Sequence, residues 1–262
     1  MNEAGKKGLL VVSFGTSVNE TREKTIDVIE DELRAACPEY ALYRAWTSGM
    51  IIRKLWKRDG VRIDTVAEAM ERMIADGVTR VTVQPTHIIN GVENDLMKQD
   101  VLKYRDHFER ITFGTPLLTS EADSRAAIRA VMAEAGEIGA DEALVLMGHG
   151  TTHYANTVYA ALDYMCKDLG YRNVFLGTVE AYPSLDTLLR QVEALGVRKV
   201  TLAPFMVVAG DHAINDMSGD EDSWRSRFEQ AGFEVTCVLK GLGEYGGIRK
   251  LYVEHAKAAM GE

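Results

Sequence analysis

Short apolar runs alternate along the chain with longer segments in which apolar residues recur at helical spacing. The apolar runs predict strands over residues 8–14, 40–45, 78–85, 111–113, 143–147, 173–178, 197–208 and 234–239. The clearest helical segments are 20–36, 120–135 and 184–195. Strand and helix alternate throughout, which predicts an α/β protein with parallel sheets.

The second half of the chain repeats the pattern of the first. Residues 77–85 (GVTRVTVQP) match residues 196–204 (GVRKVTLAP) at five of nine positions, and LLVVSFGTS at 9–17 resembles ALVLMGHGTT at 143–152. We therefore predict two similar half-domains, 1–138 and 139–262, each a four-stranded parallel sheet flanked by helices.

Polar residues with metal-binding or acid-base chemistry follow several of these strands. His149, Glu180 and His212 come after the first, second and third predicted strands of the second half, and Glu93 occupies the equivalent end of the first half. Ligands of open α/β sheets bind beyond the carboxyl ends of the strands. We expect these four residues to converge on one cleft between the half-domains.

Two imidazoles and a carboxylate favour a first-row divalent metal such as Co, Ni, Fe or Zn, whereas Mg or Ca prefers oxygen ligands. Imidazole also accepts protons near neutral pH. The same group of residues could hold a metal, abstract protons, or do both.

Charge, apolar runs and missing motifs exclude several classes of partner and cofactor. A net charge of −9 argues against a nucleic-acid partner. No apolar run has the length of a membrane span or of a signal-peptide core, so we expect a cytoplasmic protein with no membrane partner. Neither a dinucleotide fingerprint nor a P-loop is present, and no organic cofactor is expected. The basic residues around Arg53 indicate either a solvated helix face or a local site for an acidic ligand.

A series of motifs gives the chain a family resemblance. LLVVSFGTS, TSGMIIRKL, HIING followed by Glu93, MGHG, VEAYP and VAGDHAIND occur in that order. Together they resemble the anaerobic sirohydrochlorin cobaltochelatases, the class II chelatases of cobalamin synthesis, whose fold is similar to that of ferrochelatase. The likeness runs from near residue 6 to near residue 255, and Val92 stands where the family pattern has an acidic residue.

The resemblance implies insertion of Co(II), as the substrate metal, into sirohydrochlorin or its oxidised form without ATP. It implies catalytic roles for His149, His212 and Glu93, with Glu180 as a further metal ligand beside the two histidines. Contacts to the tetrapyrrole are expected from the matching motifs and the basic helix, at Phe14, Gly15, Thr16, Asn90, Gly91 and Arg53.

Several alternatives stay open at this point. The ligand types do not separate Co(II) from Ni(II) or Fe(II). A non-catalytic protein that binds a metal or a tetrapyrrole would use the same residues. A histidine-dependent hydrolase is disfavoured because no nucleophile motif accompanies the histidines. Association into a homo-oligomer is not decided by the sequence.

Overall fold

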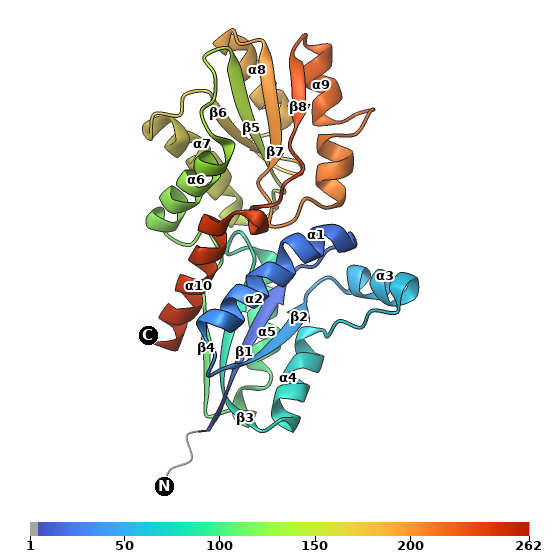
Figure 1. Cartoon of the computed structure of the whole chain (residues 1–262), viewed down its shortest axis with the longest axis vertical. Coiled ribbons are helices and arrows are strands. Elements are labelled where there is room, and N and C mark those ends of the chain that lie inside the picture. Colours follow the sequence, from blue (N-terminus) through green and yellow to red (C-terminus); the bar gives the residue numbers. More distant parts are fainter. Residues whose placement is uncertain (1–4, 262) are drawn as a thin grey trace. The chain divides into compact units, whose positions relative to one another are not determined.

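The computed structural model describes residues 5–261, which fold into two compact units (Figure 1). Among the described residues, the first unit comprises 5–119 and 248–261, and the second unit comprises Ser120–Gly247. Each unit is built on one sheet of four parallel strands, in agreement with the predicted fold class.

The sheet of the first unit has the order β2-β1-β3-β4. Its strands are β1 (Lys6–Ser13), β2 (Ala41–Trp46), β3 (Val78–Pro85) and β4 (Arg110–Phe113). Its helices are α1 (Asn19–Lys24), α2 (Ile26–Ala36), α3 (Gly49–Asp59), α4 (Val66–Ala75), α5 (Val92–Leu102) and, from Ile248 on, α10 (Gly246–Met260), with a short turn at Arg105–His107. Alternate strand residues such as Leu10 and Val83 pack with Met73 of α4 and Met97 of α5 in one buried cluster.

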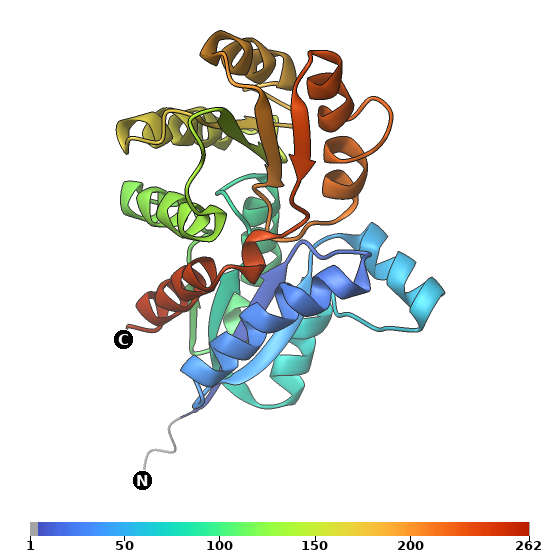
Figure 2. The ribbon, with the colours of Figure 1, turned by 45° about the horizontal axis from the view of Figure 1, so that its top comes forward.

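The sheet of the second unit has the order β6-β5-β7-β8, which repeats that of the first. Its strands are β5 (Glu142–Gly148), β6 (Val174–Thr178), β7 (Lys199–Pro204) and β8 (Glu234–Cys237). Its helices are α6 (Glu121–Ala135), α7 (Thr157–Asp168), α8 (Leu185–Leu195) and α9 (Trp224–Gln230), with short helical turns at Tyr154–Asn156, Ala213–Met217 and Leu242–Glu244. Figure 2 shows α6 and α7 side by side, and α9 on the opposite side of the sheet.

Two predicted elements differ in extent. The segment 20–36 is not one helix but α1 and α2, because the hydroxyl of Thr25 donates to the carbonyl of Thr21 and the backbone at Thr25 leaves helical geometry (φ −125°, ψ −80°). The strand predicted over 197–208 ends at Pro204, so a loop carries the chain from β7 to His212. Pro204 has no backbone N–H to donate, although the amide of the next residue, Phe205, still donates to the carbonyl of Met147 on β5 at 2.7 Å.

The observed units also have other bounds than the predicted halves 1–138 and 139–262. Helix α6 belongs to the second unit, where Arg125 contacts Asp168 at 3.4 Å, and most of α10 belongs to the first. The Tyr252 hydroxyl of α10 donates to the carbonyl of Thr86 at 2.8 Å. The chain therefore enters the second unit one helix earlier than predicted and returns to the first with its last helix.

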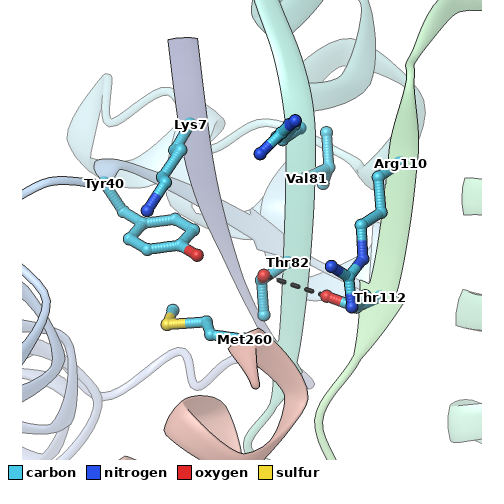
Figure 3. A pocket seen from close by; sticks show the side chains of 8 residues that line it. Lys7, Tyr40, Val81, Thr82, Arg110, Thr112 and Met260 are labelled. Carbon is cyan, nitrogen blue, oxygen red and sulfur yellow. Dashed lines mark hydrogen bonds between the residues drawn. The ribbon is translucent and has the colours of Figure 1, made fainter. Parts of the chain in front are cut away.

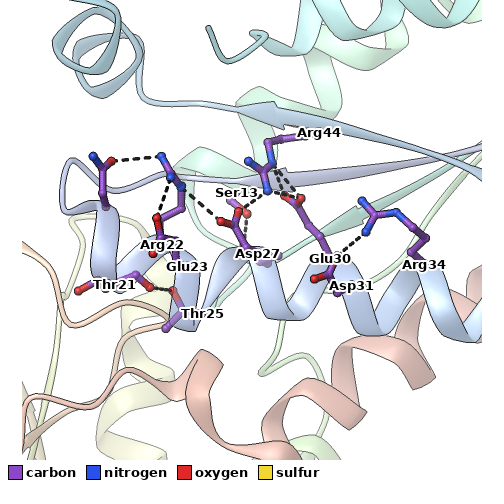
Figure 4. Close-up of polar contacts among 12 residues, drawn as sticks. Ser13, Thr21, Arg22, Glu23, Thr25, Asp27, Glu30, Asp31, Arg34 and Arg44 are labelled. Carbon is purple, nitrogen blue, oxygen red and sulfur yellow. Dashed lines mark hydrogen bonds and ion pairs between the residues drawn. The ribbon is translucent and has the colours of Figure 1, made fainter. Parts of the chain in front are cut away.

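An ion-pair network attaches α2 to the first sheet (Figure 4). The Arg44 guanidinium on β2 donates to the carboxylate of Glu30 at 2.8 Å and also contacts Asp27. Because the Glu30 side chain is only 3% exposed, burial raises the pKa of its carboxyl against the opposing effect of Arg44. Arg44 thus has a structural role in packing and is not available to an acidic ligand.

Candidate metal site

The carboxyl ends of β5 and β6 place two of the predicted ligands beside each other. His149 follows β5 directly, and Glu180 lies two residues beyond the end of β6. The amide of Val179 donates to the carbonyl of Gly148, and that of Glu180 to the carbonyl of His149, both at 3.0 Å. These bonds extend the pairing of β5 and β6 beyond the strands, and they hold the two side chains next to one another.

His212 completes the cluster from the loop that follows β7. It stands at the start of the short helical turn Ala213–Met217, with its ring edge-on to that of His149 at a centroid distance of 4.7 Å and an interplanar angle of 87°. Nε2 of His149 lies 3.9 Å from Oε1 of Glu180. One ligand atom from each of the three residues lies within 4.8 Å of the others, so a single cation can contact all of them.

Hydrogen bonds fix which imidazole nitrogen faces a metal. Nδ1 of His149 lies 2.8 Å from the carbonyl oxygen of Gly150, and Nδ1 of His212 lies 2.7 Å from Oδ2 of Asp216. Carbonyl and carboxylate oxygens only accept, so we assign the proton to Nδ1 in each ring, which leaves Nε2 as the metal ligand. The side chains of His149, Glu180 and His212 are 45%, 56% and 38% exposed, so an incoming ion can reach them.

Backbone geometry at the GHGTT loop requires a glycine. Gly150 has φ of +87°, and a Cβ there would lie 2.9 Å from Cβ of Thr178 and 3.0 Å from the backbone nitrogen of Ala181. The loop is further tied to the VEAYP segment by Asn156, which accepts from the amide of Thr151 and donates to the carbonyl of Tyr182. The loops that carry His149 and Glu180 are therefore one hydrogen-bonded assembly.

Glu93 lies in the first unit, as the second residue of α5, and is half-buried. Gly91 caps this helix, and the side chain of Asn90 accepts from buried Asn94 and donates to the Thr119 hydroxyl at 3.0 Å. Burial lowers the pKa of His87, at the start of the same loop, to about 4, so this imidazole is neutral at pH 7. The loop before Glu93 is thus held from within the first unit.

The other predicted substrate contacts also belong to the first unit. Phe14, directly after β1, is 45% exposed, and Thr16 is buried and accepts from the amide of Val18. Gly15 has φ of +102°, and a Cβ there would lie 2.5 Å from the ring of Trp46. Exposed Arg53 on α3 lines a pocket of about 520 Å³ together with Trp56 and other residues of α3 and the segment after it.

The structure thus brings together His149, Glu180 and His212, as the sequence predicts. The other predicted site residues lie in the first unit, and their approach to the histidines stays a prediction. They are Phe14, Gly15, Thr16, Arg53, Asn90, Gly91 and Glu93. Sequence reasoning missed Asp216 as the partner of His212, although its spacing of four residues was a usable signal. Two tyrosines near these side chains in sequence, Tyr154 and Tyr182, are 81% and 64% exposed.

Fold and site together define a class: α/β proteins with two four-stranded parallel sheets and a group of side chains that can hold a divalent metal ion. Two solved structures share the fold. SirB from Bacillus subtilis with Fe³⁺ has a TM-score of 0.67 at 13% identity, over 97% of this chain and 95% of that one. CbiX, the terminal enzyme for biosynthesis of siroheme in denitrifying bacteria, has a TM-score of 0.54 at 14% identity, over 97% and 99%.

Sequence comparison identifies the family. The family model described as cobalt chelatase (CbiK) matches residues 7–261. The sirohydrochlorin cobaltochelatase of Salmonella typhimurium is 45% identical over 256 residues, which cover 97% of both chains. Sirohydrochlorin cobaltochelatase CbiKC of Nitratidesulfovibrio vulgaris is 35% identical over 260 residues, which cover 97% of this chain and 91% of that one. The chain belongs to the cobalt chelatase (CbiK) family, and the resemblance seen in its motifs is confirmed.

Proposed function

We propose that this protein is a metal chelatase that inserts Co(II) into sirohydrochlorin, or its oxidised form, for cobalamin biosynthesis without ATP. The observation that carries the proposal is the group of His149, Glu180 and His212 at the carboxyl ends of three neighbouring strands. Family membership supplies the substrate class, since two relatives are named sirohydrochlorin cobaltochelatases.

In this proposal, the three side chains hold the incoming Co(II) before transfer. Two imidazole nitrogens and one carboxylate oxygen leave coordination positions open to water and then to ring nitrogens. A closed set of four protein ligands would retain the metal, whereas three partly exposed ligands allow it to leave. Glu180, the most exposed of the three side chains, is the ligand we expect to be released first.

Besides holding the metal, the protein must accept the protons that the macrocycle loses. Metallation replaces two pyrrole N–H protons with one divalent ion, so two protons must leave the macrocycle for each metal inserted. We assign one to the carboxylate of Glu93 and the other to an imidazole of the pair as it gives up the metal. Within residues 5–261, no hydrogen bond or ion pair engages the Glu93 carboxylate, which supports its role as an acceptor. No step transfers a phosphoryl group, in keeping with a reaction that needs no ATP.

The macrocycle carries many carboxylates, and we assign Arg53 to them. Phe14, Gly15, Thr16, Asn90 and Gly91 are proposed to contact the ring. The exposed ring of Phe14 offers a flat apolar surface, and the glycines allow close approach of the backbone. We propose no organic cofactor and no nucleic-acid partner. None of the helices within residues 5–261 is long and apolar enough to cross a membrane, and a cytoplasmic location stays a prediction.

The test is a metallation assay with purified protein and excess sirohydrochlorin, supplied in parallel with Co(II), Ni(II) and Fe(II). Metal insertion is followed by the change in the tetrapyrrole absorption spectrum. We expect many turnovers per protein with Co(II) and loss of turnover in His149→Ala. Binding of metal and tetrapyrrole without turnover would instead support a non-catalytic carrier. Faster insertion of Ni(II) or Fe(II) would reassign the metal.

A further inference from the structure

Three cationic side chains form a row across the amino-terminal end of the first sheet (Figure 3). The strand register places Lys7 of β1 opposite Arg80 of β3, and Arg80 opposite Arg110 of β4. Partners in neighbouring parallel strands project to the same face of the sheet. The three charges therefore lie side by side on one face of the sheet, near the amino-terminal ends of the strands. Phe14 and the HIING loop follow the carboxyl ends, at the opposite end of the sheet.

Like charges directly opposite one another in a sheet are destabilising. The second unit avoids this at the equivalent positions, where Glu142 lies opposite Lys199 and Lys199 opposite Glu234. The equivalence follows from the internal repeat, which aligns GVTRVTVQP with GVRKVTLAP and so Arg80 with Lys199. The same fold thus alternates charge in one unit and places three positive charges in a row in the other.

Neighbouring groups compensate the row only in part. Nε of Arg80 lies 3.3 Å from Oε2 of Glu109, with both side chains more than half exposed, and Nζ of Lys7 lies 4.9 Å from the centroid of the Tyr40 ring. Among the described residues, no carboxylate forms an ion pair with Arg110 or Lys7. Three cations against one carboxylate leave a local excess of positive charge, in a protein whose net charge is −9.

These side chains surround a pocket of about 90 Å³. Its other walls include Thr82 and Thr112, whose hydroxyls are 3.0 Å apart, and Met260 at the end of α10. One of the two hydroxyls donates to the other, so one hydroxyl proton remains to donate to a ligand. The volume is several times what one water molecule needs, but far less than a tetrapyrrole needs.

We propose that this pocket, which we call the basic-row site, binds a small multivalent oxyanion of the phosphate or dicarboxylate class. The guanidinium groups of Arg80 and Arg110 supply paired N–H donors, the Lys7 ammonium adds charge, and a threonine hydroxyl completes the donor set. The bound anion removes the repulsion along the row. The basic-row site is independent of the proposed chelatase activity, and none of its residues belongs to the candidate metal site.

The test is thermal unfolding of the full-length protein in increasing inorganic phosphate, and separately in succinate, at ionic strength held constant with sodium chloride. A ligand of the folded state raises the unfolding midpoint in a saturable way. We expect saturation in the millimolar range with at least one of the two anions, and the comparison identifies which class binds. Arg110→Ala should weaken the apparent affinity at least 10-fold.

Two further variants make the test specific. Arg110→Glu places a carboxylate opposite Arg80, as Glu234 stands opposite Lys199 in the second unit, so it should raise the midpoint without anion and abolish the response to phosphate. Arg198→Ala removes a surface arginine that pairs with Asp141 in the second unit, and it should respond as the wild type does. A midpoint that rises no more with either anion than with chloride, or an equal rise in Arg110→Glu, would overturn the proposal.

Discussion

Asp216 offers the sharpest test of how the metal site is built. Its carboxylate accepts the Nδ1 proton of His212 at 2.7 Å, one helical turn along the chain. Replacement by alanine leaves the imidazole without an orienting partner and allows its proton to move to Nε2, the atom assigned to the metal. The substitution leaves all three proposed ligands in place, so any loss of metal affinity measures their orientation alone.

The expected size follows from the exposure of Asp216. Groups that orient metal-ligating histidines typically contribute about 10- to 100-fold to metal affinity. The Asp216 side chain is 47% exposed, so water partly replaces it, and we expect the low end of this range. A loss of about 10-fold corresponds to about 1.4 kcal/mol. Asp216→Asn keeps an acceptor oxygen but loses the charge, which halves the strength of the bond and predicts a loss of about 3-fold.

Affinity for Co(II) is measured by competition with a chelator of known affinity, followed by the visible absorption of the bound ion. Asp220→Ala is the matched control, because Asp220 lies in the same acidic stretch and its side chain is 97% exposed. Its affinity should equal that of the wild type. If Asp216→Ala binds Co(II) as tightly as this control does, the assignment of the Nδ1 hydrogen bond as the orienting contact is wrong.

Three further predictions concern the framework. Gly150→Ala should weaken Co(II) binding and lower the thermal unfolding midpoint, because Gly150 has φ of +87° and a Cβ there would clash with Thr178. Co(II) titration measures the affinity, and circular dichroism measures the midpoint. A variant unchanged in both would contradict the steric reasoning. His87 has a pKa of about 4 in the folded protein against an ordinary 6.5. The stability that the buried neutral imidazole provides is therefore fully present above pH 6.5, and the free energy of unfolding falls by up to about 3 kcal/mol as the pH drops to 4. Urea unfolding should show this loss in the wild type and a smaller loss in His87→Phe, and equal losses would contradict the assignment to His87. Glu30→Ala should lower the free energy of unfolding in urea by about 2–3 kcal/mol, because it removes the buried partner of Arg44 and Asp27 compensates that charge only in part. Its Co(II) affinity should be unchanged. A loss of unfolding free energy below about 0.5 kcal/mol would contradict this role of Glu30.

The fold was predictable for two reasons. Short apolar runs typical of buried strands alternate along the chain with segments of helical spacing, and the second half of the chain repeats the pattern of the first. The repeated GV..VT..P pattern indicated equivalent strands, and β3 and β7 indeed occupy the same place in the two sheets. Bounds were less predictable where a single side chain decides them. The hydroxyl of Thr25 interrupts a helix whose apolar pattern continues, and Pro204 ends a strand whose apolar pattern runs on.

The convergence of His149, Glu180 and His212 was predictable for a geometric reason. The carboxyl ends of parallel strands all lie at the same end of the sheet. Residues that follow neighbouring strands therefore come close together even when they are far apart in sequence. The contact between Asp216 and His212 was not predicted, because it depends on the short turn Ala213–Met217, which has no hydrophobic pattern of its own. The row of Lys7, Arg80 and Arg110 was not predicted either, because it depends on the register of three strands, which the sequence pattern does not specify.

X-ray absorption spectroscopy of the Co(II)-loaded protein tests whether His149, Glu180 and His212 bind the metal. We expect a cobalt environment with two imidazole nitrogens and at least one carboxylate oxygen, and the loss of one imidazole in each of His149→Ala and His212→Ala. A spectrum with no imidazole contribution, or one that neither substitution changes, would contradict this coordination.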